Sequence, residues 1–361
     1  MTRHILRRLI QAIPTLFGIT FLTYLLMAAS PSDPVSLMAF GDPEITQTER
    51  DALAETLGLD EPWYIQYLVW LTGNDWMWWK YENGEFTELR ERYGIIRGDF
   101  DLSFNRRVGA MDLIIDRLPA TIELGIATLL VSILLGIPIG IGAAVWQGKI
   151  FDNGSRIMAV LGQAIPNFWF GLLLIIIIGI NFDQLWARGD RCDRAVAQQY
   201  VDPTARDADG RRVGATCRNV PITERYMYLI LPTIVLAYGG VAGYSRFMRT
   251  SMLDTINSDY IRTARAKGLN ARVVWFKHAA RNALIPIATF LGPAIVGIVG
   301  GAVVTEQIFN WPGLGQLYIE SIARRDYPVI MASVVISSIL VVIAYIISDI
   351  LYALFDPRIR F

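Results

Sequence analysis

The chain has 361 residues, of which 53% are hydrophobic and only 18% are charged. Lys plus Arg and Asp plus Glu number 33 each, so the net charge is zero and indicates neither an acidic nor a basic partner. The apolar residues gather in runs of roughly 20, the length of a helix that crosses a bilayer, and this excludes an ordinary soluble globular domain.

Six apolar runs are long enough to span a membrane, and together they predict an all-α polytopic membrane protein. In chain order they cover residues 9–29, 120–146, 157–180, 227–244, 283–304 and 329–354. The fourth run is the shortest, and Pro232 and three glycines weaken its pattern. The first run has the basic start of a secretory signal, but it is too long and lacks a small-residue cleavage site, so we interpret it as an uncleaved span.

The distribution of Arg and Lys predicts on which side each connecting segment lies, because cytoplasmic loops carry an excess of both. The N-terminus has three arginines and no acid before the first run, and residues 250–282 have six basic residues against two acidic ones. We therefore expect both segments in the cytoplasm, and six spans place both chain ends there. Residues 30–119 and 181–226 then lie outside, although the second of these holds eight arginines and seven acids.

These assignments divide the chain into three parts. They are residues 1–29, the cytoplasmic N-terminus and first span; residues 30–119, an extracytoplasmic segment; and residues 120–361, a five-helix core with the outer loop 181–226 and the cytoplasmic segment 250–282. Cys192 and Cys217 lie in the outer loop, where they either form a disulfide or remain two unrelated thiols.

The first outer segment has a helical pattern over residues 48–71, followed by a tryptophan cluster, Trp76, Trp78 and Trp79. Aromatic clusters stack on sugars or peptides, or they anchor a protein at the membrane interface or fill a small core. We favour the anchor or small core.

The spans hold few ionisable groups, and none lies near the membrane midplane, where ion-coupled transporters usually keep an acid or a histidine. The chain has no CxxC pair, no HExxH motif and no GxxxxGK[ST] loop, so we expect no metal site, no cofactor and no ATP hydrolysis by this chain itself. The alternatives are a secondary transporter or channel, and a membrane-embedded enzyme. The enzyme requires acids, His or Ser clustered at one depth, and no such cluster is evident.

Prolines and small residues recur inside the spans and indicate a kinked, closely packed bundle. Three glycine pairs are spaced four residues apart and are expected to line helix contacts: Gly136 with Gly140, Gly239 with Gly243, and Gly297 with Gly301. Gln163 and Asn167 flank Pro166. They either line a cargo path or satisfy the carbonyls that the kink frees, and we favour the second interpretation.

The cytoplasmic segment between the fourth and fifth spans carries a helix–break–helix pattern. Ser258 can cap a helix that begins at Asp259, and Gly268 stands where a left-handed C-terminal cap is needed. Asn270 can cap a second helix over residues 271–284, which leads into the fifth span. A short rigid helix at the membrane surface suits a groove on another protein, whereas a basic loop attracted to anionic lipid is the alternative.

The same segment contains ARAKGL (264–269) and HAARNALIPI (278–287), which resemble the cytoplasmic signature of ABC-importer permeases. More narrowly, the chain resembles the dipeptide/oligopeptide/nickel permease family, and within it the first of the two paired permeases. Further similar stretches occur in order along nearly the whole chain: LRRLIQAIPTLFGITFLTYLL, GLDEPWYIQYLVWL, GDFDLSF, DRLPATIELGIATLLVSILLGIPIG, IPNFWFGLLL, TEQIFNWPGLGQLYIESIARRDYPVI and LYALFDPRIRF. Residues 72–97 and the arginine-rich outer loop look like insertions.

The resemblance implies a permease that works with a homologous second permease, two ATP-binding subunits and an extracytoplasmic solute-binding protein. It implies that the path carries peptides, or related solutes such as oligosaccharides or nickel. It also implies that one set of residues forms the helix that couples to the ATPase: Tyr260, Ala264, Lys267, Gly268 and Leu269.

Overall fold

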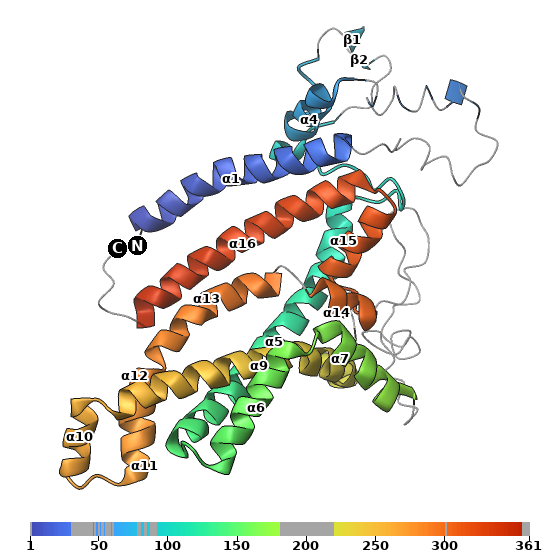
Figure 1. The fold of residues 1–361 in the computed structure, drawn as a ribbon. Coiled ribbons are helices and arrows are strands. Elements are labelled where there is room, and N and C mark those ends of the chain that lie inside the picture. The colour runs from blue at the N-terminus through green and yellow to red at the C-terminus, as the bar shows by residue number, and fades with distance from the viewer. Residues whose placement is uncertain are drawn as a thin grey trace. The chain divides into compact units, whose positions relative to one another are not determined.

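The computed structural model describes residues 2–29, 46, 48, 49, 51, 54, 59, 61–77, 81, 82, 85, 86, 92–180, 220–299 and 302–355. Regular structure in these residues is helical apart from β1 (Tyr81–Glu82) and β2 (Glu85–Phe86), which form a short antiparallel pair. The predicted all-α fold is thus confirmed (Figure 1). Cys192, Cys217, Trp78 and Trp79 lie outside the described residues.

The helices follow one another along the chain with short connections. They are α1 (Thr2–Ala28), α4 (Trp63–Thr72), the 3₁₀ turn η2 (Ile95–Arg97), α5 (Ala110–Val145), α6 (Ile150–Ala164), α7 (Asn167–Leu174), the π-helical η3 (Ile175–Ile180), α9 (Ile222–Ile256), α10 (Asp259–Ala266), α11 (Ala271–Val273), the π-helical η5 (Val274–Ala279), α12 (Ala280–Ala283), α13 (Ile285–Val299), α14 (Val303–Ile308), α15 (Leu314–Ala323) and α16 (Tyr327–Phe355).

Within the described part of the chain, five helices are long and apolar enough to cross a membrane, and a bent pair adds a sixth if it counts as one span. The five are Leu6–Ala28, Ala110–Val145, Tyr226–Ile256, Phe290–Ile308 and Tyr327–Ile350. Residues 300 and 301 of the fourth lie outside the described set. These helices coincide with five of the predicted runs, and the bent pair coincides with the run at 157–180.

The broken span is the third one, although the sequence pattern looked weakest in the fourth. Helices α6 and α7 meet at an angle of 100°. Ile165 adopts an extended conformation (φ −80°, ψ 121°) directly before Pro166, as expected because a proline disfavours the helical conformation of the residue that precedes it. Pro232, by contrast, lies inside the continuous helix α9.

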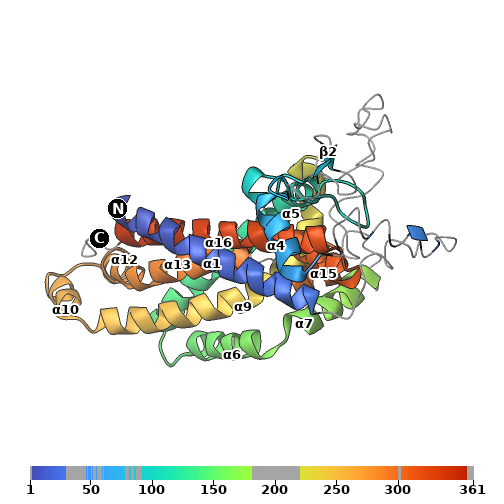
Figure 2. The ribbon, with the colours of Figure 1, turned by 90° about the horizontal axis from the view of Figure 1, so that it is seen from above.

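The chain forms two compact units. The first comprises residues 1–4, 118–316 and 343–361, and the second comprises residues 5–117 and 317–342. In the first unit α6 packs along α9 (Figure 2). Gly162 permits this contact, because a Cβ atom there would lie 2.7 Å from the Cβ of Ala242.

Helix α5 also approaches α9 closely, through the predicted pair Gly136 and Gly140. A Cβ atom on Gly140 would lie 2.5 Å from the carbonyl oxygen of Ser245, and one on Gly136 would lie 2.7 Å from the Cβ of Tyr244. This glycine contact is confirmed. The expected contact through Gly239 and Gly243 is not found, because a Cβ atom on Gly243 would meet no described atom within 4 Å, and one on Gly239 would meet only a backbone oxygen, at 3.5 Å.

A buried carboxylate organises the segment that follows α14. Glu306 is fully buried, and its oxygens accept hydrogen bonds from the Thr121 hydroxyl at 3.0 Å and from the Gln316 amide at 3.0 Å. The Thr121 oxygen in turn accepts from the Leu314 amide at 2.7 Å. A Cβ atom on Gly313 would lie 2.5 Å from this carboxylate, which explains the glycine.

Trp311 closes the same cluster. Its indole is fully buried, and its Nε1 donates to the Ala120 carbonyl at 2.9 Å. This bond uses a carbonyl of α5 close to Pro119, a proline inside the helix. The polar groups of the Glu306 segment are therefore paired internally, as a membrane interior requires.

In the second unit, α1 and α4 pack through an aromatic cluster. The hydroxyls of Thr20 and Tyr67 are 3.0 Å apart, and the ring of Tyr67 contacts Phe17 and Phe21. The indole Nε1 of Trp76 donates to the Gly73 carbonyl at 2.6 Å. Where the tryptophan cluster is described, its residue thus belongs to a small folded core, as the favoured interpretation predicts.

Asp326 joins two chain segments of the second unit that are distant in sequence. Its carboxylate accepts from the Ser103 hydroxyl and from the amide of Phe104, the latter at 3.0 Å. Nearby, Arg106 forms an ion pair with Glu320 at 2.9 Å. The motifs GDFDLSF and ARRDYPVI therefore meet in space.

Gly140→Ala tests the contact between α5 and α9. Added to a helix, alanine normally stabilises by about 1 kcal/mol, but here the methyl group would press on the α9 backbone, and overpacking costs about 1–3 kcal/mol. We expect a lower melting temperature for Gly140→Ala in detergent, measured by size-exclusion after heating. Gly243→Ala is the matched control and should melt at or above the wild-type temperature. Equal melting of the two variants would contradict this packing.

Thr121→Val tests the Glu306 cluster. The change preserves shape but removes the donor to Glu306 and the acceptor for the Leu314 amide, and a buried group left unpaired costs about 1–3 kcal/mol. Thr233→Val is the control, because the Thr233 hydroxyl is buried and has no hydrogen-bond partner among the described residues. We expect Thr121→Val to unfold at lower denaturant than wild type while Thr233→Val does not. The reverse order would refute the assignment.

Candidate functional site

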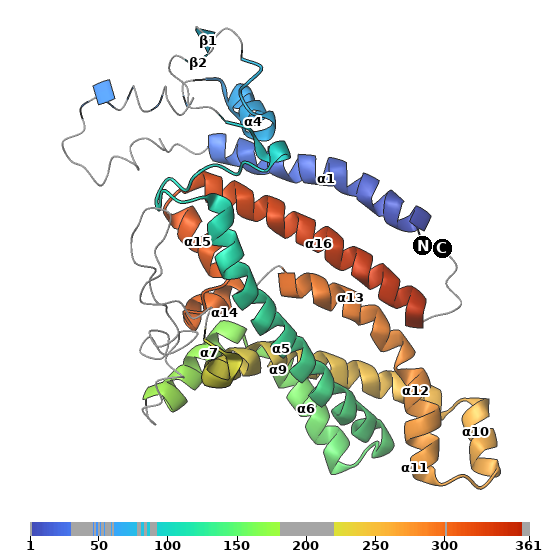
Figure 3. The same cartoon turned by 180° about the vertical axis from the view of Figure 1, so that it is seen from behind.

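The segment after α9 folds into a helical hairpin, which we define as residues 258–284. It extends beyond the end of α9 with α10 and α11 side by side (Figure 3). Helix α10 is amphipathic. Ile261 and Ala264, one turn apart, are buried against the second helix, while Tyr260 and Arg265 are exposed. The buried pair fixes which face of α10 is turned outward.

The hairpin turn follows the pattern predicted from its glycine. Gly268 has φ +75°, its amide donates to the Arg265 carbonyl at 2.9 Å, and the Leu269 amide donates to the Ala264 carbonyl at 3.4 Å. These two bonds make a Schellman motif, which satisfies the last carbonyls of the helix. The side chain of Asn270 then caps the second helix by accepting from the Arg272 amide at 3.0 Å.

Two local expectations require correction. Ser258 precedes α10 but does not cap it through its side chain, because its hydroxyl donates back to the Thr255 carbonyl at 2.6 Å. The second helix runs as predicted but is not regular, since it contains the π-helical turn η5 between α11 and α12. Single π-turns inside helices occur frequently at functional sites.

The hairpin is attached to the first unit by a continuous apolar cluster. Ile261 and Val274 of the hairpin are fully buried together with Met248 and Met252 of α9, and Ile141 of α5 belongs to the same cluster. Polar bonds reinforce the attachment. Ser251 of α9 donates to the Ala283 carbonyl at 2.8 Å, and Asn282 donates to the Tyr260 hydroxyl at 2.8 Å.

The five residues expected to couple to an ATPase lie together in the hairpin but not on one surface. Tyr260 and Leu269 are 45% and 41% exposed, and Lys267 and Gly268 are exposed at the turn. Ala264 is only 7% exposed and packs inside the hairpin. Its position holds the two helices together, so it supports the outer surface without forming part of it.

Sequence reasoning missed an exposed apolar stretch on the second helix. Phe276 is 62% exposed and Val273 is 38% exposed. Leu269, Val273 and Phe276 are separated by four and three residues, which is the helical period, and this spacing was readable in the sequence. Large apolar groups exposed together on a protruding element are typical of a surface that another protein covers.

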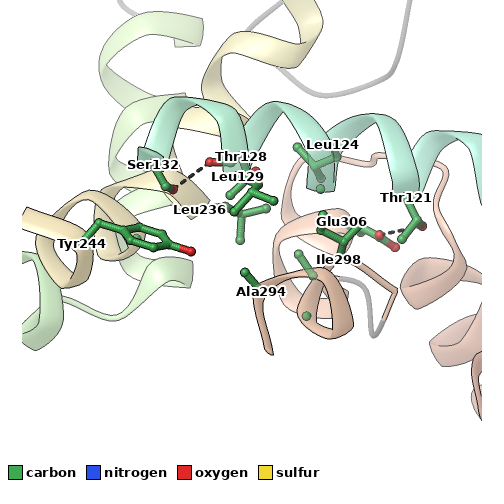
Figure 4. Close-up of a pocket in the computed structure, with 14 residues that line it drawn as sticks. Thr121, Leu124, Thr128, Leu129, Ser132, Leu236, Tyr244, Ala294, Ile298 and Glu306 are labelled. Carbon is green, nitrogen blue, oxygen red and sulfur yellow. Dashed lines mark hydrogen bonds between the residues drawn. The ribbon is translucent and has the colours of Figure 1, made fainter. Parts of the chain in front are cut away.

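A second feature of the first unit is a cavity of about 340 Å³ between α5, α9 and α13. Most of its lining is apolar, with Tyr244 at one end and Glu306 with Thr121 at the other (Figure 4). The hydroxyl of Thr128 lies on its wall, buried and without a hydrogen-bond partner among the described residues. Sequence reasoning missed this cavity as well, because residues from three helices form it.

Gln163 and Asn167, expected to satisfy the kink at Pro166, do not do so. Both are exposed, and neither side chain has a hydrogen-bond partner among the described residues. The kink is instead accommodated by the extended residues Ile165 and Pro166. The favoured interpretation of these two polar groups is therefore wrong.

Comparisons with known proteins agree with this architecture along the whole chain. Residues 136–361 match the family described as binding-protein-dependent transport system inner membrane component, and residues 1–125 match the N-terminal part of such proteins. The chain is 40% identical to the oligopeptide transport system permease protein AppB of Bacillus subtilis, over 100% of both chains. It is 34% identical to the dipeptide transport system permease protein DppB of Escherichia coli and 35% identical to the di/tripeptide permease DppB of Pseudomonas aeruginosa, each over 100% of this chain and 99% of the relative. The chain therefore belongs to the family of binding-protein-dependent transport system inner membrane components and is a multi-pass permease subunit of an ABC importer.

Proposed function

We propose that this permease imports peptides, and that it forms the path across the membrane together with a second, homologous permease. The proposal is supported by the names of the full-length relatives, which belong to oligopeptide, dipeptide and di/tripeptide systems. Oligosaccharides and nickel are the alternative cargoes. An extracytoplasmic solute-binding protein delivers the cargo to the outer segments, residues 30–119 and 181–226.

In the proposed topology both chain termini and the hairpin lie in the cytoplasm. The excess of basic residues in the N-terminal segment and in residues 250–282 supports this orientation. Residues 1–29 then form the first span with its cytoplasmic start, and residues 120–361 form the five-helix core. The alternating order of spans leaves the two long polar segments on the outer side.

The hairpin docks on a separate ATP-binding subunit, and this contact supplies the energy. The observation that carries this proposal is that the hairpin presents Tyr260, Leu269 and Phe276 outward while Ile261 and Ala264 bury its inner face. Lys267 and Gly268 form the tip beside this apolar surface. The chain itself is not an enzyme, and two ATP-binding subunits hydrolyse ATP in the assembly.

The attachment of the hairpin supports a mechanical role. Its buried residues share one cluster with the ends of α5 and α9, so a displacement of the hairpin displaces those helices. Helices α5 and α9 also line the 340 Å³ cavity. Movement imposed at the hairpin would thus alter the packing between α5, α9 and α13 and open the path alternately to each side.

Gly268→Val tests the coupling role. A β-branched side chain is strained at φ +75°, and open space around Gly268 leaves the strain as the main effect. We expect the complex to insert normally but to lose most ATP-driven uptake of a labelled dipeptide in proteoliposomes. Gly98→Val is the matched control, since Gly98 has φ +85°, open space and a place in the outer segment.

The result separates the alternatives. Wild-type uptake without ATP would favour a secondary transporter or channel, and Gly268→Val uptake equal to that of Gly98→Val would remove the hairpin from the coupling step. Uptake of nickel or an oligosaccharide instead of the dipeptide would change the cargo and leave the coupling role intact.

A further inference from the structure

Helices α6 and α9 enclose an open pocket of about 310 Å³ that the transport role does not use. Three arginines line it: Arg156 from α6, and Arg246 and Arg249 from α9. Ser155, Ser245, Ala159 and Val160 complete the lining. The pocket thus combines a dense group of positive charges with hydroxyl groups and a small apolar wall.

One carboxylate neutralises only part of this charge. Asp152 is buried and holds Arg249 in a two-pronged ion pair, with its oxygens 2.5 Å from Nε and 2.9 Å from Nη2. The same carboxylate accepts from the Gly148 amide at 2.9 Å, which fixes its orientation. Three arginines against one aspartate leave two positive charges in excess. Arg156 and Arg246 have no ion-pair partner among the described residues.

An apolar surface continues from the pocket along α6. Val160 lines the pocket and is 67% exposed, and Ile157 and Leu161 on the same helix are also exposed. A ligand that satisfies both features carries an anionic group for the arginines and a hydrocarbon part for α6. Free phosphate satisfies only the first, because it makes no use of the exposed apolar side chains.

The depth of the pocket in the membrane agrees with this chemistry. Arg249 lies seven residues before Ile256, the last residue of α9, and therefore about 10 Å from the end of the helix at 1.5 Å per residue. Arg156 lies six residues after the start of α6 at Ile150, or about 9 Å along it. In the orientation proposed above, on which this step rests, both arginines lie at the level of the cytoplasmic headgroups.

We propose that this pocket binds the phosphate headgroup of an anionic phospholipid from the cytoplasmic leaflet, with one acyl chain lying along α6. The guanidinium groups of Arg156 and Arg246 bind the phosphate oxygens, and arginine suits phosphate because it donates several hydrogen bonds in one plane. Arg249, held by Asp152, supplies the rigid side of the pocket. Basic pockets between membrane helices on the cytoplasmic side are suited to such headgroups.

The double variant Arg156→Gln with Arg246→Gln tests the proposal. The assembled importer is purified, delipidated and titrated with phosphatidylglycerol or phosphatidylcholine in mixed micelles, and bound lipid is counted by native mass spectrometry. Each arginine near an anionic headgroup contributes about a fivefold gain in affinity, so the double variant should bind phosphatidylglycerol about 25-fold more weakly. The control is Arg7→Gln with Arg281→Gln, which removes two exposed basic residues outside the pocket and should bind as wild type does.

Every outcome decides the question. Preference of the wild-type complex for phosphatidylglycerol, lost in the double variant and kept in the control, supports the lipid site. Glycerol 3-phosphate added at millimolar concentration should not displace the lipid, and displacement would assign the pocket to a free phosphate compound. Equal binding of both lipids, or full binding by the double variant, overturns the proposal.

A fourth readout separates a protein partner from a lipid. Loss of an importer subunit from the double variant, with lipid binding unchanged, would make this pocket a protein interface and overturn the proposal. Lipid binding is measured without ATP or cargo. Failure of dipeptide uptake in the wild-type complex would therefore count against the proposed function and leave this result standing.

Discussion

The burial of the hairpin against the ends of α5 and α9 is the contact on which the proposed mechanism depends. Ile261 and Val274 are removed from water only because Met248 and Met252 cover them. Burial of each such side chain contributes roughly 1.5–3 kcal/mol, so the hairpin and the helix ends behave as one body and not as a tethered loop. Without this cluster, a force applied at residue 268 would bend the turn and move nothing in the membrane.

Polar groups within the membrane helices are paired or sit on a cavity wall, as the low polarity of the bilayer demands. Glu306 is the clearest case, since its carboxylate, Thr121 and the amides after Trp311 satisfy one another. Asp152 does the same for Arg249 between α6 and α9. The two clusters differ in what they leave over. The Glu306 segment is closed on itself, whereas the arginines beside Asp152 retain excess charge that a ligand from outside the chain can neutralise.

Local chemistry was predictable where one residue decides the outcome. Gly268 had to adopt a left-handed conformation and Asn270 had to cap a helix, because few residue types do either, and span lengths followed from the thickness of the bilayer. The break at Pro166 and the continuous helix at Pro232 could not be told apart, since the effect of a membrane proline depends on its neighbours. Inward-facing Ala264 and exposed Phe276 were indicated by helical spacing but required the position of the second helix.

A distance measured between α9 and the hairpin tests the central claim most directly. Spin labels at Thr250 and Arg265, both exposed, are attached to the assembled importer after Cys192 and Cys217 are replaced by serine. The distance is then recorded by pulsed electron resonance in the nucleotide-free and ATP-trapped states. We predict the same distance in both states, because hairpin and helix end move together. A distance that changes with nucleotide would show that the hairpin pivots on α9, and would contradict this mechanism.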